Sequence, residues 1–308
     1  MSSKQLVRLA AALGLLVIVW GVLALVRRPP EDRSVSLAIP RVDTAAVDTM
    51  VLTKARDTAV ITRSGKQWST NGFPADSQSV AMLLAALADT AHPTELVAQN
   101  SSSHERLGVT GDSALRAVVH TRRTTQPALD LIAGSRTGDY GGVFVRRNGD
   151  DAVYTLRGGL FDAFTRSLDD WRDKRIASVV ADSVAAIEVH HGGRGYTLKR
   201  SGKAWTLSSG KPADSSAVSN LLGDYRDLRA SGFPARAQGD SLDFAHPTAS
   251  ARLLSKAGKP LAELALDSTA GGMWARASSN PAVFKLDTWI WGQLVPAEST
   301  LVAKPKKK

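Results

Sequence analysis

The chain has 308 residues, of which 43% are hydrophobic and 22% are charged, as is usual for a folded protein with a substantial core. It contains no cysteine, which excludes disulfides, thiol catalysis and thiolate metal sites. The net charge is +10, but eight positive charges lie in residues 1–28 and 301–308, which contain no acidic residue. The body between them carries a net charge of only +2, which excludes the broad positive field of a nucleic-acid-binding protein. Basic ends around a neutral body favour a membrane neighbourhood.

Residues 9–26 are predicted to cross a membrane as an uncleaved signal anchor. These 18 residues include no charge, and a helix of that length spans about 27 Å, close to the hydrocarbon thickness of a bilayer. A buried core helix and a cleaved secretory signal are the alternatives, and the sequence Arg27-Arg28-Pro29-Pro30 is a poor cleavage site. Residues 1–8 then form a cytoplasmic N-terminus and residues 27–46 an extended tether. The flanking charges do not decide on which side of the membrane the body lies.

Two motifs occur twice in the body. The sequence Arg63–Trp68 (RSGKQW) returns 137 positions later as Arg200–Trp205 (RSGKAW), and Pro74–Ser77 (PADS) returns 138 positions later as Pro212–Ser215. A period this long indicates a duplicated domain rather than a solenoid of short repeats. The sequence therefore predicts a repeat domain one over residues 47–176, a linker over 177–183, a repeat domain two over 184–301 and a basic tail over 302–308.

The first repeat begins with β-like runs, continues with an amphipathic helix and ends with further strands. The helix is predicted from Asp76 as its N-cap residue and from an apolar stripe at helical spacing, formed by Val80, Leu83, Leu84 and Leu87. A helical turn is expected at Leu160-Phe161. The predicted strands are Met50–Thr53, Ala59–Thr62, Leu115–His120, Leu129–Ala133, Gly142–Arg146 and Val153–Leu156.

The second repeat has the same order of elements. Asp214 is the predicted N-cap residue, followed by the stripe Val218, Leu221, Leu222 and Tyr225, and a helical turn is expected at Ile290-Trp291. The predicted strands are Ala186–Val189, Tyr196–Leu198, Ala251–Leu254, Leu261–Leu266, Gly272–Arg276 and Val283–Leu286. Each repeat is thus expected to be an α+β domain, a mainly antiparallel sheet covered by an amphipathic helix.

Few residues indicate specific chemistry. Trp68, Asp76, Trp205 and Asp214 are interpreted as the structural repeat motif: the tryptophans fill the core and the aspartates cap helices. His190 and His191 are adjacent on a predicted strand and point to opposite faces, so they cannot easily bind one metal ion. We therefore expect no catalytic residue, no metal and no cofactor.

One charged segment is a candidate for partner docking, because it occurs in the first repeat alone. Its residues are Asp169, Asp170, Arg172, Asp173, Lys174 and Arg175. The planar guanidinium groups of Arg172 and Arg175 suit specific ion pairing with a partner. A solvated connector held by internal salt bridges is the alternative interpretation of this segment.

The order of these motifs resembles the bacterial family DUF4340, a domain of unknown function. The resemblance rests on Trp68 with Ala75-Asp76-Ser77, on Gly142–Arg146 (GVFVR) and on Leu168–Lys174 (LDDWRDK), and it covers nearly all of the chain from Leu9 onward. The second repeat lacks the LDDWRDK segment. The resemblance implies a body in the periplasm and an association with ABC transport systems of the gliding-motility kind, and it supplies no catalytic residue.

These observations favour a non-enzymatic accessory protein, held by a single-pass anchor in the inner membrane, that binds a transporter-type membrane complex. A module that binds an anionic envelope glycan is the alternative, since repeat one is rich in arginine at residues 122, 123, 136, 146 and 147. An enzyme would need a cleft with converging polar residues between the two repeats. Nucleic acid is not an expected partner, and the identity of any small-molecule ligand stays open.

Overall fold

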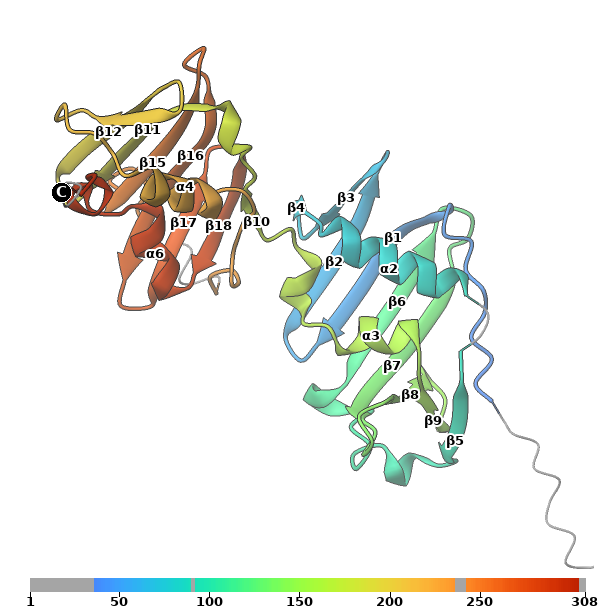
Figure 1. Ribbon diagram of the computed structural model, residues 1–308. Helices are drawn as coiled ribbons and strands as arrows, with labels where there is room; N and C mark the ends of the chain where they lie inside the picture. Colours follow the sequence, from blue (N-terminus) through green and yellow to red (C-terminus); the bar gives the residue numbers. More distant parts are fainter. Residues whose placement is uncertain (1–35, 90–91, 236–241, 305–308) are drawn as a thin grey trace, which may run out of the picture.

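The computed structural model describes residues 36–89, 92–235 and 242–304, which form two antiparallel sheets, each covered on one face by helices (Figure 1). The fold class is therefore α+β, as predicted. The predicted anchor at residues 9–26 lies outside the described residues. No helix in the described ranges is long and apolar enough to span a bilayer.

The first sheet has nine strands in the order β4-β3-β2-β1-β6-β7-β8-β9-β5. Every predicted strand of repeat one lies within one of them or overlaps it, and the sequence reasoning missed β3, β4 and β5. The bounds are β1 Val47–Lys54, β2 Asp57–Ser64, β3 Gln67–Thr70, β4 Phe73–Pro74, β5 Thr94–Ala98, β6 Leu115–Thr121, β7 Leu129–Arg136, β8 Val143–Arg147 and β9 Val153–Leu156. Neighbouring strands are antiparallel throughout; for example, Met50 of β1 lies opposite Ile61 of β2 and Val119 of β6.

Two helices, α2 (Ser77–Ala88) and α3 (Gly159–Thr165), cover one face of the first sheet. The carboxylate of Asp76 caps α2 by accepting a hydrogen bond of 2.7 Å from the Ser79 amide, which confirms the predicted N-cap. Of the predicted stripe, Val80, Leu83 and Leu87 are buried in the core, whereas Leu84 is only half-buried. The helix ends at Asp89, whose extended backbone leaves the helical conformation.

The second sheet has seven strands in the order β13-β12-β11-β15-β16-β17-β18. The run β3-β2-β1-β6-β7-β8-β9 of the first sheet has the same order. Corresponding strands pair in the same way, and all the pairs are antiparallel. The bounds are β11 Val184–His191, β12 Arg194–Ser201, β13 Ala204–Leu207, β15 Ala249–Ser255, β16 Pro260–Thr269, β17 Gly272–Ala277 and β18 Asn280–Leu286. A separate pair, β10 (Arg175–Ala177) with β14 (Leu228–Arg229), lies beside it.

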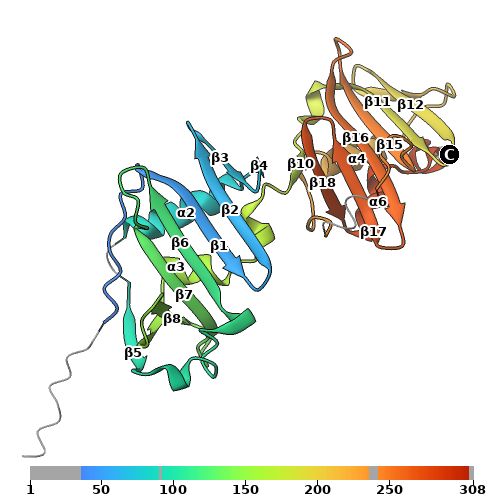
Figure 2. The same cartoon turned by 180° about the vertical axis from the view of Figure 1, so that it is seen from behind.

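The helices α4 (Ser215–Asp224) and α6 (Thr288–Leu294) cover the second sheet, and the view from behind shows both sheets in front of their helices (Figure 2). Asp214 caps α4 through bonds from two amides, those of Ser216 and Ala217. Tyr225 follows α4 in the core, and its buried hydroxyl donates to the Leu294 carbonyl at 2.9 Å. Burial raises the pKa of that hydroxyl, so it stays a donor.

The repeated RSGK motif forms the same hairpin turn in both domains. The glycine of the motif, Gly65 in the first domain and Gly202 in the second, has a positive φ of 61°, a conformation that favours glycine. The arginine that begins the motif donates to the glycine carbonyl at 3.1 Å and lies over the tryptophan ring that ends it. Trp205 is buried, as predicted, but Trp68 is only half-buried.

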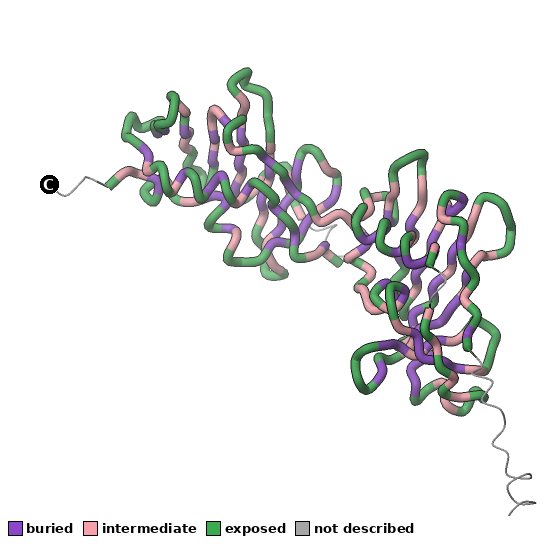
Figure 3. Tube along the Cα trace, turned by 45° about the vertical axis from the view of Figure 1, so that its right-hand side comes forward, coloured by how far each residue is buried: buried purple, intermediate pink, exposed green. Residues whose placement is uncertain are grey.

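Each domain has its own apolar core, and exposed residues lie along its outer surface (Figure 3). The chain crosses from the first core, which contains Trp171, to the second, which contains Ile176. Residues 36–46, the described part of the predicted tether, pack against the first domain. Leu37 and Val42 are buried in its core, and the Val42 amide donates to the Leu87 carbonyl.

The cap of α4 provides a first test of this fold. Replacing Asp214 by alanine leaves the Ser216 and Ala217 amides without their acceptor, so we expect the free energy of unfolding to fall by about 1 kcal/mol. The Asp214→Asn variant keeps a capping oxygen and should lose much less. Urea denaturation of both variants measures the difference, and an unchanged midpoint for Asp214→Ala would contradict the cap.

Candidate functional site at the domain junction

The predicted docking segment lies at the junction of the two domains. It follows α3 as a short 3-10 helix, η3 (Leu168–Trp171), and then returns to the start of α2. The Asp76 amide donates to the Trp171 carbonyl at 3.0 Å, the Asp173 amide donates to the Pro74 carbonyl at 2.8 Å, and Ala75 forms a bridge with Arg172. We call residues 171–173 the return segment. Trp171 is almost completely buried, so its side chain anchors the segment in the first core.

The second domain has an equivalent return segment at residues 301–303, although its sequence lacks the charged motif. It follows η5 (Glu298–Leu301), and the Asp214 amide donates to the Leu301 carbonyl at 2.8 Å. Ala213 forms a bridge with Val302, as Ala75 does with Arg172. At the constant offset of 130 positions, the polar residues Asp169 and Asp170 correspond to Ser299 and Thr300, and Arg172 corresponds to Val302. The backbone arrangement is therefore common to both domains, whereas the charges at positions 169, 170 and 172 occur only in the first. Lys174 has a lysine counterpart, Lys304.

Arg172 connects the two domains. Its guanidinium carbon lies 4.3 Å from the ring centre of Phe73 on β4 and 3.5 Å from that of Phe233, which packs with the second core. Among the described residues, its buried Nε finds no hydrogen-bond partner, because aromatic rings cover the group. Burial lowers the pKa of this guanidinium, an effect that the charge of Asp169 opposes. Arg172 is thus a cation enclosed between rings from both domains.

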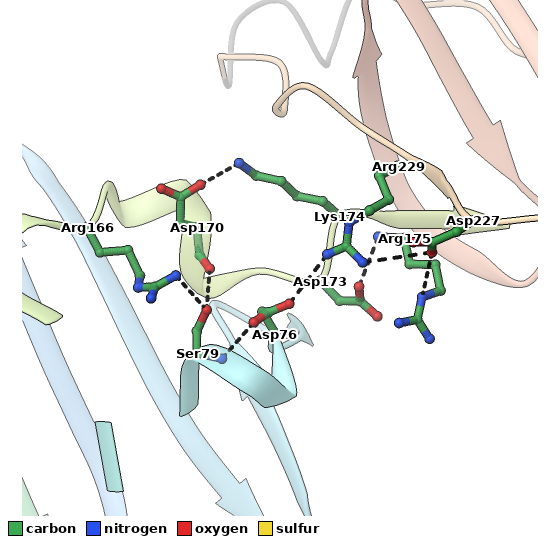
Figure 4. A network of polar contacts seen from close by, with 9 residues as sticks. All are labelled: Asp76, Ser79, Arg166, Asp170, Asp173, Lys174, Arg175, Asp227 and Arg229. Carbon is green, nitrogen blue, oxygen red and sulfur yellow. Dashed lines mark hydrogen bonds and ion pairs between the residues drawn. The ribbon is translucent and has the colours of Figure 1, made fainter. Parts of the chain in front are cut away.

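Several ion pairs lie at the junction (Figure 4). Lys174 donates to Asp170 at 2.5 Å, and Arg175 lies 3.5 Å from Asp227. Across the junction, Arg229 of β14 lies 3.6 Å from Asp76, the cap of α2, which joins the domains by a second polar contact. These pairs are partly exposed, so each contributes little to stability by itself.

A polar pocket of about 260 Å³ opens beside these pairs. Four cationic side chains line it, those of Arg166, Arg172, Lys174 and Arg229, against two carboxylates, Asp76 and Asp170. A larger groove of about 1170 Å³ lies on the other side of Arg166 and Arg172 and reaches the segment at residues 233–235. Arg166 and Arg172 line both spaces, so they form the wall between them.

The structure brings the six predicted docking residues together and gives most of them contacts within the chain. Asp170, Lys174 and Arg175 form ion pairs, and the Asp173 carboxylate accepts a bond from the Arg175 amide. Asp169 is exposed. The sequence reasoning missed Phe73, whose counterpart in the second domain is Lys211. That difference between the two domains was the available signal, because an aromatic residue at a domain edge gains from packing against a partner group.

The other candidate residues have local contacts. His191 lies edge-on to Trp291, with ring centres 6.4 Å apart. In the described ranges, no three side chains of the types that bind metals come together. Among the arginines considered for glycan binding, Arg123 pairs with Asp43, Arg136 lies over Phe161, and the others donate to backbone carbonyls, namely Arg122, Arg146 and Arg147.

Comparison with known proteins gives one match. The sequence profile of the family described as "Domain of unknown function (DUF4340)" matches residues 68–247, which is more than half of the chain. The matched range includes the return segment of the first domain, the junction and the first strands of the second sheet. No curated protein and no solved structure matches the chain.

The Arg172 contact predicts how firmly the domains are held together. Because the chain has no cysteine, spin labels can be placed on cysteines introduced at Lys66 and Lys256, which are exposed in different domains. Arg172→Ala should broaden the distance distribution between the labels, and Arg172→Lys should broaden it less. Arg175→Ala is the control, since Arg175 lies outside the aromatic stack. An equally narrow distribution in Arg172→Ala would contradict the role of this side chain.

The Asp170–Lys174 pair predicts a pH dependence of stability. Burial by itself would raise the pKa of the Asp170 carboxyl, but hydrogen bonds from Lys174 and Ser167 outweigh it and hold the pKa below the usual value. A carboxyl with a lowered folded-state pKa stabilises the fold above its unfolded pKa, and this stabilisation is lost as pH falls through the folded pKa.

We therefore expect Asp170→Asn to lower the free energy of unfolding near neutral pH, by less than about 1 kcal/mol because the pair is partly exposed. The difference from the unsubstituted protein should disappear at a pH below the folded pKa. Urea denaturation over a pH series measures it. A difference that persists in strong acid would show that the substitution acts through packing instead.

Proposed function

Because the chain belongs to the DUF4340 family, whose description assigns no activity, we propose from the junction a role in protein interaction. In this proposal the chain is a non-enzymatic accessory protein. A single-pass anchor holds it in the inner membrane, its body lies in the periplasm, and it docks onto a transporter-type membrane complex. The two domains arose by internal duplication, which the shared strand order and the equivalent return segments support.

The difference between the two return segments carries the proposal. A feature that is needed only for folding should occur in both domains. The backbone contacts of the return segments do occur in both. The charges at positions 169, 170, 172 and 173 occur in the first domain alone, because the second has Ser299, Thr300, Val302 and Ala303 there. They hold the neighbouring domain through Arg172 and leave a charged rim at the junction, where Asp169 and Arg175 are exposed. Exposed charges at a fixed junction suit recognition of one partner, because charge patterns give specificity.

The proposed location rests on the charge-free residues 9–26 and on the basic chain ends. Residues 36–46 pack against the first domain, so an anchor just before them would hold this domain nearest to the bilayer. The junction would then lie one domain away from the lipid, within reach of the periplasmic part of a membrane complex.

Glycan binding receives less support from the arginines considered for it. Their guanidinium groups contact a carboxylate, an aromatic ring or backbone carbonyls of the first domain itself. Partnered groups offer fewer donors to a polymer, although partly exposed ones still attract anions at low salt.

Affinity capture of the full chain from membranes in mild detergents tests the proposal. We expect a membrane protein to be recovered with the chain. The Asp169→Ser variant places the serine of the second domain at the exposed rim, and it should recover several-fold less of that membrane protein. The converse variant Ser299→Asp is the matched control and should not change recovery. Recovery of the chain alone in every mild detergent would refute a stable partner, and equal recovery with both variants would refute the role of the rim.

A further inference from the structure

The helix α2 exposes an unusual surface for a helix on the outside of a domain. Its 12 residues include no charged side chain. The exposed positions after its first turn are Ala81, Met82 and Ala85, and 46% of the Met82 surface is accessible. A surface helix ordinarily carries polar or charged residues on its outer face. Beyond the first turn, where Ser77 and Gln78 are exposed, the outer face of α2 lacks such residues, which indicates that something covers it.

The equivalent helix of the second domain provides an internal comparison. At the offset of 138 positions, Met82 corresponds to Asn220 and Ala85 to Gly223, and the exposed outer face of α4 also includes Ser219. Both helices bury the same stripe against the same kind of sheet. Folding therefore does not require an apolar outer face, and that face is specific to the first domain.

A groove of about 350 Å³ runs along this face between α2 and α3. Its apolar walls come from Met82, Leu83, Ala86 and Ala163, with Trp171 behind them. It shares Ser79, Met82 and Arg166 with the polar pocket at the junction, so the two spaces are adjacent. The corresponding groove of the second domain is lined by Asn220, Asp224 and Gln293, where the first has Met82, Ala86 and Ala163.

The two ends of the groove differ in charge. Two carboxylates, Asp89 and Asp162, lie at the end away from the junction. At the junction end, Asp76 and Asp170 pair with Arg229 and Lys174, whereas Arg166 donates to the Ser79 hydroxyl and Arg172 lies between rings. In the described part of the chain, neither Arg166 nor Arg172 forms an ion pair with a carboxylate. The Arg166 guanidinium, which lines the groove at its junction end, can therefore complement a negative charge.

We propose that this groove binds a segment of the partner protein that presents an apolar side chain next to a carboxylate. The apolar side chain lies on Met82 and Ala85, and the carboxylate meets the guanidinium of Arg166 at the junction. Methionine suits the contact because its flexible side chain adapts to the shape of a partner. The inference rests on the proposed interaction function and names the surface and the kind of segment it binds.

Site-specific photocrosslinking of the full chain in its native membranes tests this. Benzoylphenylalanine replaces Ala85, which is exposed in the groove, or Gly223, its counterpart in the second domain, as the matched control. We expect an adduct from position 85 and none from position 223. Mass spectrometry of the adduct should identify a protein segment with Asp or Glu beside an apolar residue.

Charge variants at Met82 sharpen the test. This side chain is about half exposed, so the domain tolerates both Met82→Glu and Met82→Lys, which thermal unfolding can check. Glutamate at this position repels an acidic segment and occupies Arg166, and the crosslink from position 85 should fall about tenfold. Lysine removes the same methionine but keeps the attraction, so the crosslink should persist. Equal loss in both variants would overturn the charge complementarity.

The outcomes separate this inference from the proposed function. A partner that co-purifies while position 85 forms no adduct would overturn the groove and leave the interaction function intact. An adduct with lipid, or with a basic segment, would overturn the acidic partner. A chain that purifies alone and crosslinks at neither position would overturn both.

Discussion

The fold of each domain depends on a backbone contact between its last residues and the residues just before its main helix. After its closing helix, the chain returns to the residues just before the main helix, and the amide of the capping aspartate donates to the carbonyl of a buried residue, Trp171 or Leu301. This contact holds the cap, the main helix and the closing helix together over the sheet. Because the chain enters the second domain directly after the first return segment, the same contact positions the junction.

At the junction, a cation takes the place of an apolar residue. The second domain has Val302 where the first has Arg172, and only Arg172 lies between aromatic rings of two domains. A guanidinium group presents two flat faces to rings while its edges keep donors, so one side chain packs and stays charged. The cost of burying this charge is limited by the ring faces and by Asp169.

Much of the fold was predictable from the sequence because its signals are local. The capping aspartates and the apolar stripes follow helical spacing, and the strands follow period-two patterns, as with Met50 and Leu52 on β1. The strand β5 was missed because its residues alternate only between half-buried and exposed. An edge strand with weak burial leaves little hydrophobic pattern, and its pairing with β9 is a long-range contact.

The candidate site was predictable only in part. The charged segment could be recognised because the second repeat lacks it. The residues that contact it from the second domain could not be recognised in this way. Phe233 has no repeated motif around it, and Arg229 reaches Asp76 from more than 150 positions away in the chain. The apolar outer face of α2 was readable in principle from Met82 and Ala85. It became informative once the structure identified their counterparts on α4.

The described chain begins at the outer end of the first domain and leaves at the far end of the second (Figure 1). A tensile load applied between these ends would act on the two sheets and on the junction in series. The sheets resist through many strand-to-strand hydrogen bonds, whereas the junction resists through a stacked guanidinium, the packing of Phe73 on the second core and one long ion pair. The junction is therefore the compliant joint of the molecule. Under load, the contacts between the domains would break before either sheet lost a strand. They would form again when the load was removed.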